Sequence, residues 1–120
     1  MHNFRDLEVW TKSMKLCKIF YIASNNFPKD ELFGLTSQSR RSLYSIPSNI
    51  AEGAGRDTNA QFFHFLNIAL GPSFEFETQI LIANDLGFFN NGDFDIIYSE
   101  IKYIQNMLVK LKQKFNTQTF

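Results

Sequence analysis

Apolar residues recur along this chain at alternating steps of three and four, and this spacing constrains the fold more than any other feature. Such steps place side chains on one face of an α-helix. One series is Phe62, Leu66, Ala69, Ser73, Phe76, Ile80 and Ala83, and a second is Phe94, Ile97, Ile101, Ile104, Leu108, Leu111 and Phe115. No strand-like alternation competes with these patterns, so the chain is predicted to be all-α.

The first predicted helix, over residues 5–26, has two apolar ridges. One consists of Leu7, Trp10, Met14, Cys17 and Tyr21, and the other of Leu16, Phe20, Ala23 and Phe27. A helix at the edge of a lone bundle needs only one apolar side. We expect the first ridge to face the core and the second ridge to be available to another copy of the chain.

The remaining helices are predicted over residues 30–53, 58–86 and 93–115. The second helix has core positions Leu32, Leu35, Leu43, Ile46 and Ile50. Pro47 and Pro72 lie inside helical patterns and predict bends. Glycines predict helix ends at Gly53, Gly55 and Gly87. Asp57 or Thr58 is predicted to cap the third helix, with Gln61 completing a capping box if Thr58 is the cap, and Asp93 is predicted to cap the fourth. Short connections predict an antiparallel up-down four-helix bundle, a single domain over residues 1–120 with a frayed tail at 116–120.

Composition narrows the class of protein. The 120 residues carry 12 basic and 12 acidic side chains, which argues against binding nucleic acid by bulk charge alone. A single cysteine, Cys17, allows no disulfide within the chain and favours a reducing compartment. No leader pattern is present at the N-terminus, and no apolar run approaches the roughly 18 residues of a membrane span. We therefore expect a cytoplasmic protein without a membrane partner.

Charge is unevenly distributed along the chain. Residues 1–56 carry a net +3, residues 57–101 a net −7 and residues 102–120 a net +4. In an up-down bundle the first and fourth helices are neighbours, so their lysines could form one phosphate-contacting surface. The candidate nucleic-acid contacts are Lys12, Lys15, Lys18, Lys110, Lys112 and Lys114. The alternative is that these lysines only solvate the outer faces of the helices.

No catalytic or metal-binding motif stands out. A di-iron bundle needs Glu-x-x-His on two helices, and Gln61 stands where His64 would require the glutamate. Cys17 on an apolar stripe is expected to be a buried, inert thiol. Glu75 and Glu77 point in different directions on a helix and do not form an acid/base pair. We predict no enzymatic activity, no cofactor and no metal.

A polar stripe runs beside the apolar face of the second helix. It comprises Gln38, Arg41, Ser45, Asn49 and Glu52. One interpretation is a structural or interface network that includes Arg56, in which Arg40 or Arg41 pairs with Glu75 or Glu77. Contact with a ligand or nucleic acid, or plain solvent exposure, are the alternatives. Under the structural interpretation, Arg41, Asn49 and Glu52 should be at least partly buried.

Several strings of the sequence resemble a known family. The chain opens with Phe4-Arg5-Asp6-Leu7-Glu8-Val9-Trp10 and continues with Ser45-Ile46-Pro47-Ser48-Asn49-Ile50-Ala51-Glu52-Gly53. Over about residues 4–112 it resembles the four-helix-bundle proteins first noticed in intervening sequences of bacterial 23S ribosomal RNA genes. It is also similar to the accessory variability proteins of diversity-generating retroelements. Pro72 stands where the family usually has serine.

The resemblance implies a ring-like homopentamer without known enzymatic activity. It also implies binding of RNA or DNA, and of a reverse transcriptase or other protein, through a basic surface. We therefore expect a non-enzymatic oligomeric module that binds nucleic acid as an accessory factor. The alternative is a ring-like scaffold or protein-interaction module with no nucleic-acid role.

Overall fold

The structure is a computed structural model that describes residues 1–116. The tail predicted to fray lies, from residue 117 onward, outside the described residues. Four long helices and three short helical turns make up the described chain. In order they are η1 (Phe4–Asp6), α1 (Glu8–Ser24), η2 (Lys29–Glu31), η3 (Leu32–Thr36), α2 (Ser37–Ala54), α3 (Asn59–Asp85) and α4 (Asp93–Lys114).

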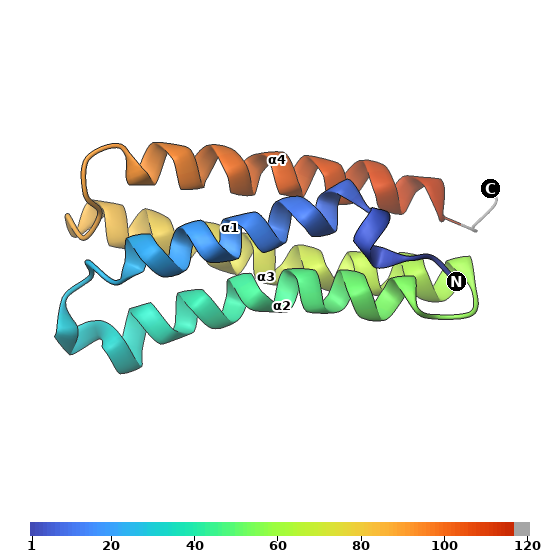
Figure 1. Ribbon diagram of the computed structural model, residues 1–120, viewed down its shortest axis with the longest axis horizontal. Coiled ribbons are helices and arrows are strands. Elements are labelled where there is room, and N and C mark those ends of the chain that lie inside the picture. Colours follow the sequence, from blue (N-terminus) through green and yellow to red (C-terminus); the bar gives the residue numbers. More distant parts are fainter. Residues whose placement is uncertain (117–120) are drawn as a thin grey trace.

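The four long helices lie side by side and alternate in direction (Figure 1). Helix α1 packs against α2 and α4, and α3 packs against α2 and α4, so α1 and α3 are diagonal neighbours. The N-terminus of α1 and the C-terminus of α4 lie at the same end of the bundle. The predicted all-α up-down four-helix bundle is confirmed.

The apolar seams of the two C-terminal helices supply about half of the buried residues of one continuous core. All seven predicted positions of α3, from Phe62 to Ala83, are buried. In α4 the central positions Ile97, Ile101, Ile104 and Leu108 are fully buried. The outer positions of that seam are half-buried and pack against the core. The spacing therefore predicted which sides of these helices face inward.

For α1 the predicted orientation is right only in part: Leu7, Trp10 and Cys17 of the expected core ridge are half-buried and pack against the core, but the helix centres its buried face on the other ridge. The ridge expected to be surplus is the core side: Leu16 and Phe20 are fully buried, and Ala23 is 5% exposed. Met14 and Tyr21, from the ridge expected to face inward, are 45% and 51% exposed. Small polar residues complete the inward stripe, since Ser13 and Ser24 are buried and donate to carbonyl groups one turn earlier. A count of apolar residues alone misses such positions.

The start of the second helix also differs from the prediction. The chain forms a 3-10 turn and a π turn before α2 begins at Ser37, with a non-helical backbone at Gly34. The Glu31 carboxylate accepts a hydrogen bond from the Leu35 backbone N–H at 3.4 Å and caps this turn. Leu32, predicted as core, is 46% exposed, and Phe33 is 91% exposed. Helices α2 and α3 are each assigned as one continuous helix through Pro47 and Pro72, and the non-helical backbone lies at Gly34.

The helix ends follow local chemistry. Thr58 and Gln61 exchange the two hydrogen bonds of a capping box at the start of α3, as predicted. Gly87, with φ of +75°, follows the end of α3. Gly92, with φ of +85°, precedes α4 in place of the expected cap Asp93, whose carboxylate instead lies in the first turn. Acidic groups there are favourable toward the positive end of the helix dipole.

Gly53 is not a helix terminator. It is buried inside α2, where a Cβ atom would lie 2.5 Å from the Cβ atom of Phe65 on α3. Glycine at this position lets the two backbones approach closely. The glycine that follows the helix, Gly55, has no comparable contact.

Candidate functional site

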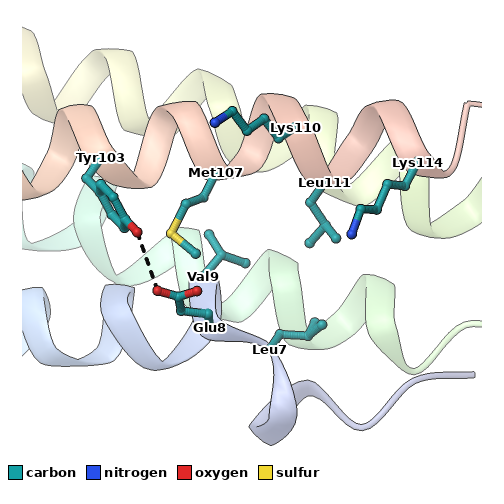
Figure 2. Close-up of a pocket in the computed structure, with 8 residues that line it drawn as sticks. All are labelled: Leu7, Glu8, Val9, Tyr103, Met107, Lys110, Leu111 and Lys114. Carbon is teal, nitrogen blue, oxygen red and sulfur yellow. Dashed lines mark hydrogen bonds between the residues drawn. The ribbon is translucent and has the colours of Figure 1, made fainter.

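The structure brings part of the predicted lysine set to the seam between α1 and α4. A groove of about 350 Å³ opens there near the start of α1 (Figure 2). We call it the α1/α4 groove. Its lining residues are Leu7, Glu8, Val9, Tyr103, Met107, Lys110, Leu111 and Lys114.

The groove has an apolar floor and a charged rim. Val9 is 1% exposed, and Met107 and Leu111 are half-buried against the core. Lys110 and Lys114 are exposed and belong to none of the ion pairs found among the described residues. Among residues 1–116, Glu8 supplies the only acidic side chain of the lining.

The Glu8 carboxylate is weakly engaged. It accepts a hydrogen bond from the Tyr103 hydroxyl at 3.5 Å, which is long for an O–H donor. Across the same seam, the Lys12 Nζ atom lies 5.2 Å from the centroid of the Tyr103 ring. Lys12 therefore joins the edge of the groove, as expected from the neighbouring positions of α1 and α4.

The other three lysines do not enter this groove. Lys15 and Lys18 are exposed on α1. Lys112 contacts α3: its Nζ atom donates to Asn67 Oδ1 at 3.0 Å and lies 5.5 Å from the Phe63 ring centroid. The six lysines therefore do not converge on one site. On α4, Lys112 lies two residues from Lys110 and Lys114, and two residues turn a helix by about 200°, so Lys112 points toward α3 and away from the groove.

The expected pairing between the second and third helices is wrong for Arg40. Its guanidinium donates to α1 and the segment after it, at 2.8 Å to Ser24 Oγ, 3.1 Å to Tyr21 O and 3.0 Å to Asn25 Oδ1. It also stacks 4.3 Å from the centroid of the Tyr21 ring. Arg40 thus holds α2 against the end of α1 and does not reach Glu75, which is exposed, or Glu77.

The polar stripe of α2 is mostly on the surface of the chain. Three of its residues are exposed, namely Gln38, Arg41 and Glu52. The expected burial of Arg41 and Glu52 within the chain is therefore wrong. Asn49 and Ser45 are half-buried, but both donate to carbonyl groups of their own helix. Cover by a second copy of the chain stays a prediction.

The polar contacts of α2 differ from those that were predicted for the polar stripe. Glu52 pairs with Arg56 at 2.9 Å on the surface, and the Arg56 guanidinium lies 4.8 Å from the Phe65 ring centroid. Exposed pairs of this kind contribute about 0–1 kcal/mol. The cross-helix bond to α3 comes from Ser42, which donates to Gln79 Oε1.

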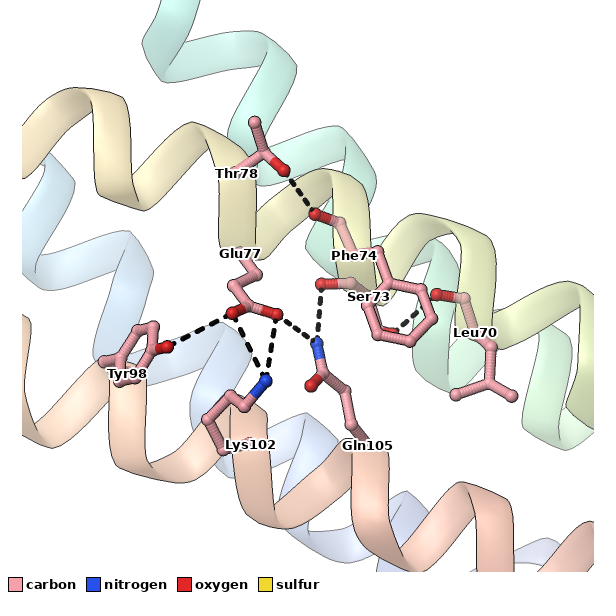
Figure 3. Close-up of polar contacts among 8 residues, drawn as sticks. All are labelled: Leu70, Ser73, Phe74, Glu77, Thr78, Tyr98, Lys102 and Gln105. Atoms are coloured by element: carbon pink, nitrogen blue, oxygen red, sulfur yellow. Dashed lines mark hydrogen bonds and ion pairs between the residues drawn. The ribbon is translucent and has the colours of Figure 1, made fainter.

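Glu77 instead forms the main polar network of the bundle, with α4 (Figure 3). Its carboxylate accepts from Gln105 Nε2 at 2.9 Å, from Tyr98 Oη at 3.2 Å and from Lys102 Nζ at 3.3 Å. The Gln105 side chain also donates to the Ser73 carbonyl at 3.3 Å. Burial acts to raise the pKa of Glu77, but the hydrogen bonds from Gln105, Lys102 and Tyr98 outweigh it and hold that pKa below its ordinary value.

The partners of Glu77 were not singled out from the sequence. Tyr98, Lys102 and Gln105 follow one another at steps of four and three, parallel to the apolar seam of α4 and one position along from it. The same spacing rule that identified the seam therefore marks a polar flank beside it. Only the packed structure shows that this flank faces Glu77.

A second groove lies between α1 and α2 and contains Cys17. We call it the α1/α2 groove, and its lining residues are Phe4, Trp10, Met14, Cys17, Tyr44, Pro47, Ser48 and Ala51. Trp10 packs edge to face on Phe4, with ring centroids 5.0 Å apart. Burial raises the pKa of the Cys17 thiol to about 12, so the thiol is protonated at neutral pH.

Cys17 should therefore react slowly with thiol reagents in the folded protein. The thiolate is the nucleophile, and a pKa of about 12 makes it scarce at pH 8. We expect the rate of reaction with Ellman's reagent at pH 8 to be at least tenfold lower in native protein than in protein unfolded in urea. Equal rates in both states would contradict an inert thiol.

Neither a metal cluster nor a membrane-spanning helix is evident in residues 1–116. No group of three His, Cys, Asp or Glu side chains in that range could hold a metal ion. No helix in the same range is long and apolar enough to cross a membrane.

Comparisons with known proteins agree with this architecture. A family model described as 23S rRNA-intervening sequence protein matches residues 5–110. A crystal structure of a protein with unknown function from the S23 ribosomal protein family of Bacteroides thetaiotaomicron is similar, with a TM-score of 0.78 and 24% identity. That match covers 88% of this chain and 95% of the other, and at this identity it supports the fold alone. No curated protein matches the chain.

Proposed function

Starting from the fact that this chain belongs to the 23S rRNA-intervening sequence protein family, we propose that it is a non-enzymatic oligomeric module that binds structured RNA or DNA. The nucleic acid would bind along the edge formed by α1 and α4. The observation that carries this proposal is the pair of exposed lysines, Lys110 and Lys114, with no ion-pair partner in residues 1–116. Lysines without counter-charges are available to phosphates.

Over residues 102–114 the α4 side of this edge carries lysines and no acidic residue, although the chain as a whole is neutral. Lys12 contributes from α1, and Lys15 and Lys18 continue along the same helix. Most of the acidic residues of the chain lie in residues 57–101 and so belong to α3, to the connections at its two ends and to the first part of α4. A neutral chain can therefore present one cationic edge, and copies of that edge in an oligomer would add to its field.

Exposed apolar side chains support the oligomeric part of the proposal. Phe33 is 91% exposed and lines a hollow beside the α1/α2 groove, together with Tyr21 and Tyr44. On the diagonal helix α3, Phe74 and Ile82 are 52% and 45% exposed. Large apolar patches are uncommon on monomers. Two unlike apolar surfaces on different helices favour head-to-tail contacts, which close into rings such as a pentamer.

Nucleic-acid binding is tested by mobility shift with a structured RNA hairpin over a salt series. We expect affinity to fall as salt rises, because each neutralised phosphate releases counterions. The double substitution Lys110→Ala and Lys114→Ala should weaken binding and reduce the slope of log K against log salt by roughly 0.7–0.9 for each phosphate that is no longer neutralised. Lys29→Ala, at the opposite end of the bundle, is the matched control and should leave the slope unchanged.

The same assay separates the proposal from a scaffold without a nucleic-acid role. Absent binding, or binding insensitive to salt, would contradict the proposal and favour the scaffold. Whether or not nucleic acid binds, co-purification from the native host is the experiment that searches for a protein partner such as a reverse transcriptase.

Oligomeric state is tested by light scattering at micromolar concentration. We expect about 70 kDa, five times the 14.0 kDa of one chain. Phe33→Glu should lower this mass without unfolding the monomer, because the side chain is 91% exposed. Ile96→Glu, also on an exposed apolar residue but in the first turns of α4, is the control. A monomer mass for the unmodified protein would refute the oligomer.

A further inference from the structure

The α1/α4 groove combines three chemistries within one small volume. The ammonium groups of Lys110 and Lys114, which have no ion-pair partner in residues 1–116, lie on the α4 side. The weakly engaged carboxylate of Glu8 lies on the α1 side, and apolar side chains form the floor. Its volume of about 350 Å³ falls within the range of small-molecule sites. We propose that this groove binds one unpaired guanine nucleotide, with the base on the floor and the phosphate on the lysines. This inference rests on the proposed function, for which it would supply a preference among bases.

The phosphate end is argued from Lys110 and Lys114. They are four residues apart on α4 and therefore neighbours on one helix face. Like charges at this spacing repel each other, and no carboxylate within residues 1–116 pairs with either. The two side chains point in different directions (Figure 2), so both must turn toward a shared phosphate, which then relieves the repulsion and accepts hydrogen bonds from both ammonium groups.

The base end is argued from the floor of the groove. Met107 points from α4 toward Val9 and Glu8 of α1 (Figure 2). A thioether makes favourable contacts with aromatic rings, and the half-buried Leu111 extends the apolar surface. Tyr103 is 47% exposed beside this floor, so part of its ring surface is accessible to a base although the Lys12 Nζ atom lies 5.2 Å from the ring centroid. Unpaired bases in RNA are recognised by such contacts, which a base-paired helix does not allow.

The preference for guanine is argued from Glu8. An ionised carboxylate only accepts hydrogen bonds, and that of Glu8 receives only the long bond from Tyr103 among the described residues. The Watson–Crick edge of guanine presents two adjacent donors, N1–H and N2–H, which match the two oxygens of a carboxylate. Adenine, cytosine and uracil each present an acceptor next to their donor on that edge, and the acceptor would repel the carboxylate.

The methionines of the chain provide the assay. The sequence has three, and their methyl groups can be labelled with carbon-13. Met107 lies in the α1/α4 groove, whereas Met14 lies in the α1/α2 groove and serves as an internal control. We expect GMP to shift the Met107 methyl resonance saturably without shifting that of Met14. AMP should bind at least fivefold more weakly, and inorganic phosphate alone should leave Met107 unchanged.

Two variants test the assigned roles. Glu8→Gln should abolish the preference for GMP over AMP. Lys110→Ala with Lys114→Ala should weaken GMP at least fivefold while leaving the weaker binding of guanosine unchanged. Equal affinities for GMP and AMP in the unmodified protein, equal shifts at Met107 and Met14, or no shift at Met107 would each overturn the proposal.

Comparison with the mobility-shift assay separates the two proposals. If the RNA hairpin binds with salt dependence but GMP leaves Met107 unchanged, the guanine site is wrong and the proposed function stands. If GMP shifts Met107 but no RNA binds, the site stands as a nucleotide site and the proposed function is wrong.

Discussion

Replacing Gly53 by alanine should destabilise the protein by about 2 kcal/mol, although alanine is the better helix former. In an unpacked helix the same change would stabilise by about 1 kcal/mol. Here the new Cβ atom would lie 2.5 Å from Phe65 Cβ and 3.1 Å from Phe62 Cδ1. The Cβ atom of Phe65 cannot move without its backbone, so α2 and α3 must separate, and overpacking of this kind costs about 1–3 kcal/mol.

Gly55→Ala is the matched control for this substitution. It lies two residues further along, at the C-terminal cap of α2, and the nearest atoms to its added Cβ are backbone oxygens at 3.6 and 3.7 Å. We expect its effect on the free energy of unfolding to stay within about 0.5 kcal/mol. Both variants are compared by urea denaturation. Equal stabilities would show that the contact between α2 and α3 tolerates a wider spacing.

Glu77→Ala should cost about 3 kcal/mol of stability. The Glu77 side chain is 16% exposed, and its removal leaves the Gln105 amide, on a residue only 4% exposed, with a single acceptor at 3.3 Å. A buried donor that loses its partner costs about 1–3 kcal/mol, and bonds to charged groups lie at the upper end. The Lys102 side chain is 45% exposed and adds little, because solvent screens its charge.

Glu75→Ala is the control, two residues earlier on the same helix but exposed. Surface substitutions of this kind change stability by less than about 0.5 kcal/mol. Denaturant melts of both variants test the difference. Similar losses for Glu75→Ala and Glu77→Ala would show that the network contributes nothing specific.

The Glu77 network also predicts a dependence on pH. The folded-state pKa of Glu77 lies below its ordinary value, so the unfolded chain takes up this proton first as pH falls. The carboxylate therefore contributes stability that is present above the unfolded pKa of about 4.3 and is lost as pH falls through the folded value. The stability gap between the unmodified protein and Glu77→Gln should narrow below about pH 4. A gap that is constant from pH 7 to pH 3 would contradict this.

Sequence spacing could predict the position of some residues of the candidate sites but not of others. The neighbouring positions of α1 and α4 followed from the up-down topology, and with them the approach of Lys12 to Tyr103 on α4. Lys112 lies two residues from Lys110 and Lys114 yet contacts Asn67 on α3. A helix turns by about 200° over two residues. The division of the lysines therefore depends on the exact rotation of α4 about its axis.

The polar stripe of α2 is a second case in which sequence spacing alone did not determine where the side chains lie. Its spacing correctly placed Asn49 and Ser45 beside the buried face. How much of each stripe residue is exposed depends on how much of it the neighbouring helix covers. Gly53 lets α3 approach α2 closely at Phe65, and a side-chain hydrogen bond between the two helices runs from Ser42 to Gln79. Arg41 is left outside.

What the sequence determined by itself is the number of helices, their order and the inward faces of α3 and α4. In those helices the apolar residues keep one period over many turns, so one rotation buries far more apolar surface than any other. Tertiary structure alone decided the rotation of α1, the break at Gly34 and the partner of Glu77. Helix α1 has two apolar sides of similar hydrophobicity. The choice between them depends on the volume of the side chains that fit the core and on Ser13 and Ser24, whose hydroxyls donate to carbonyl groups of their own helix. The packing of α1 against α2 and α4 around the shared core therefore selected between two sides that the sequence alone left nearly equal.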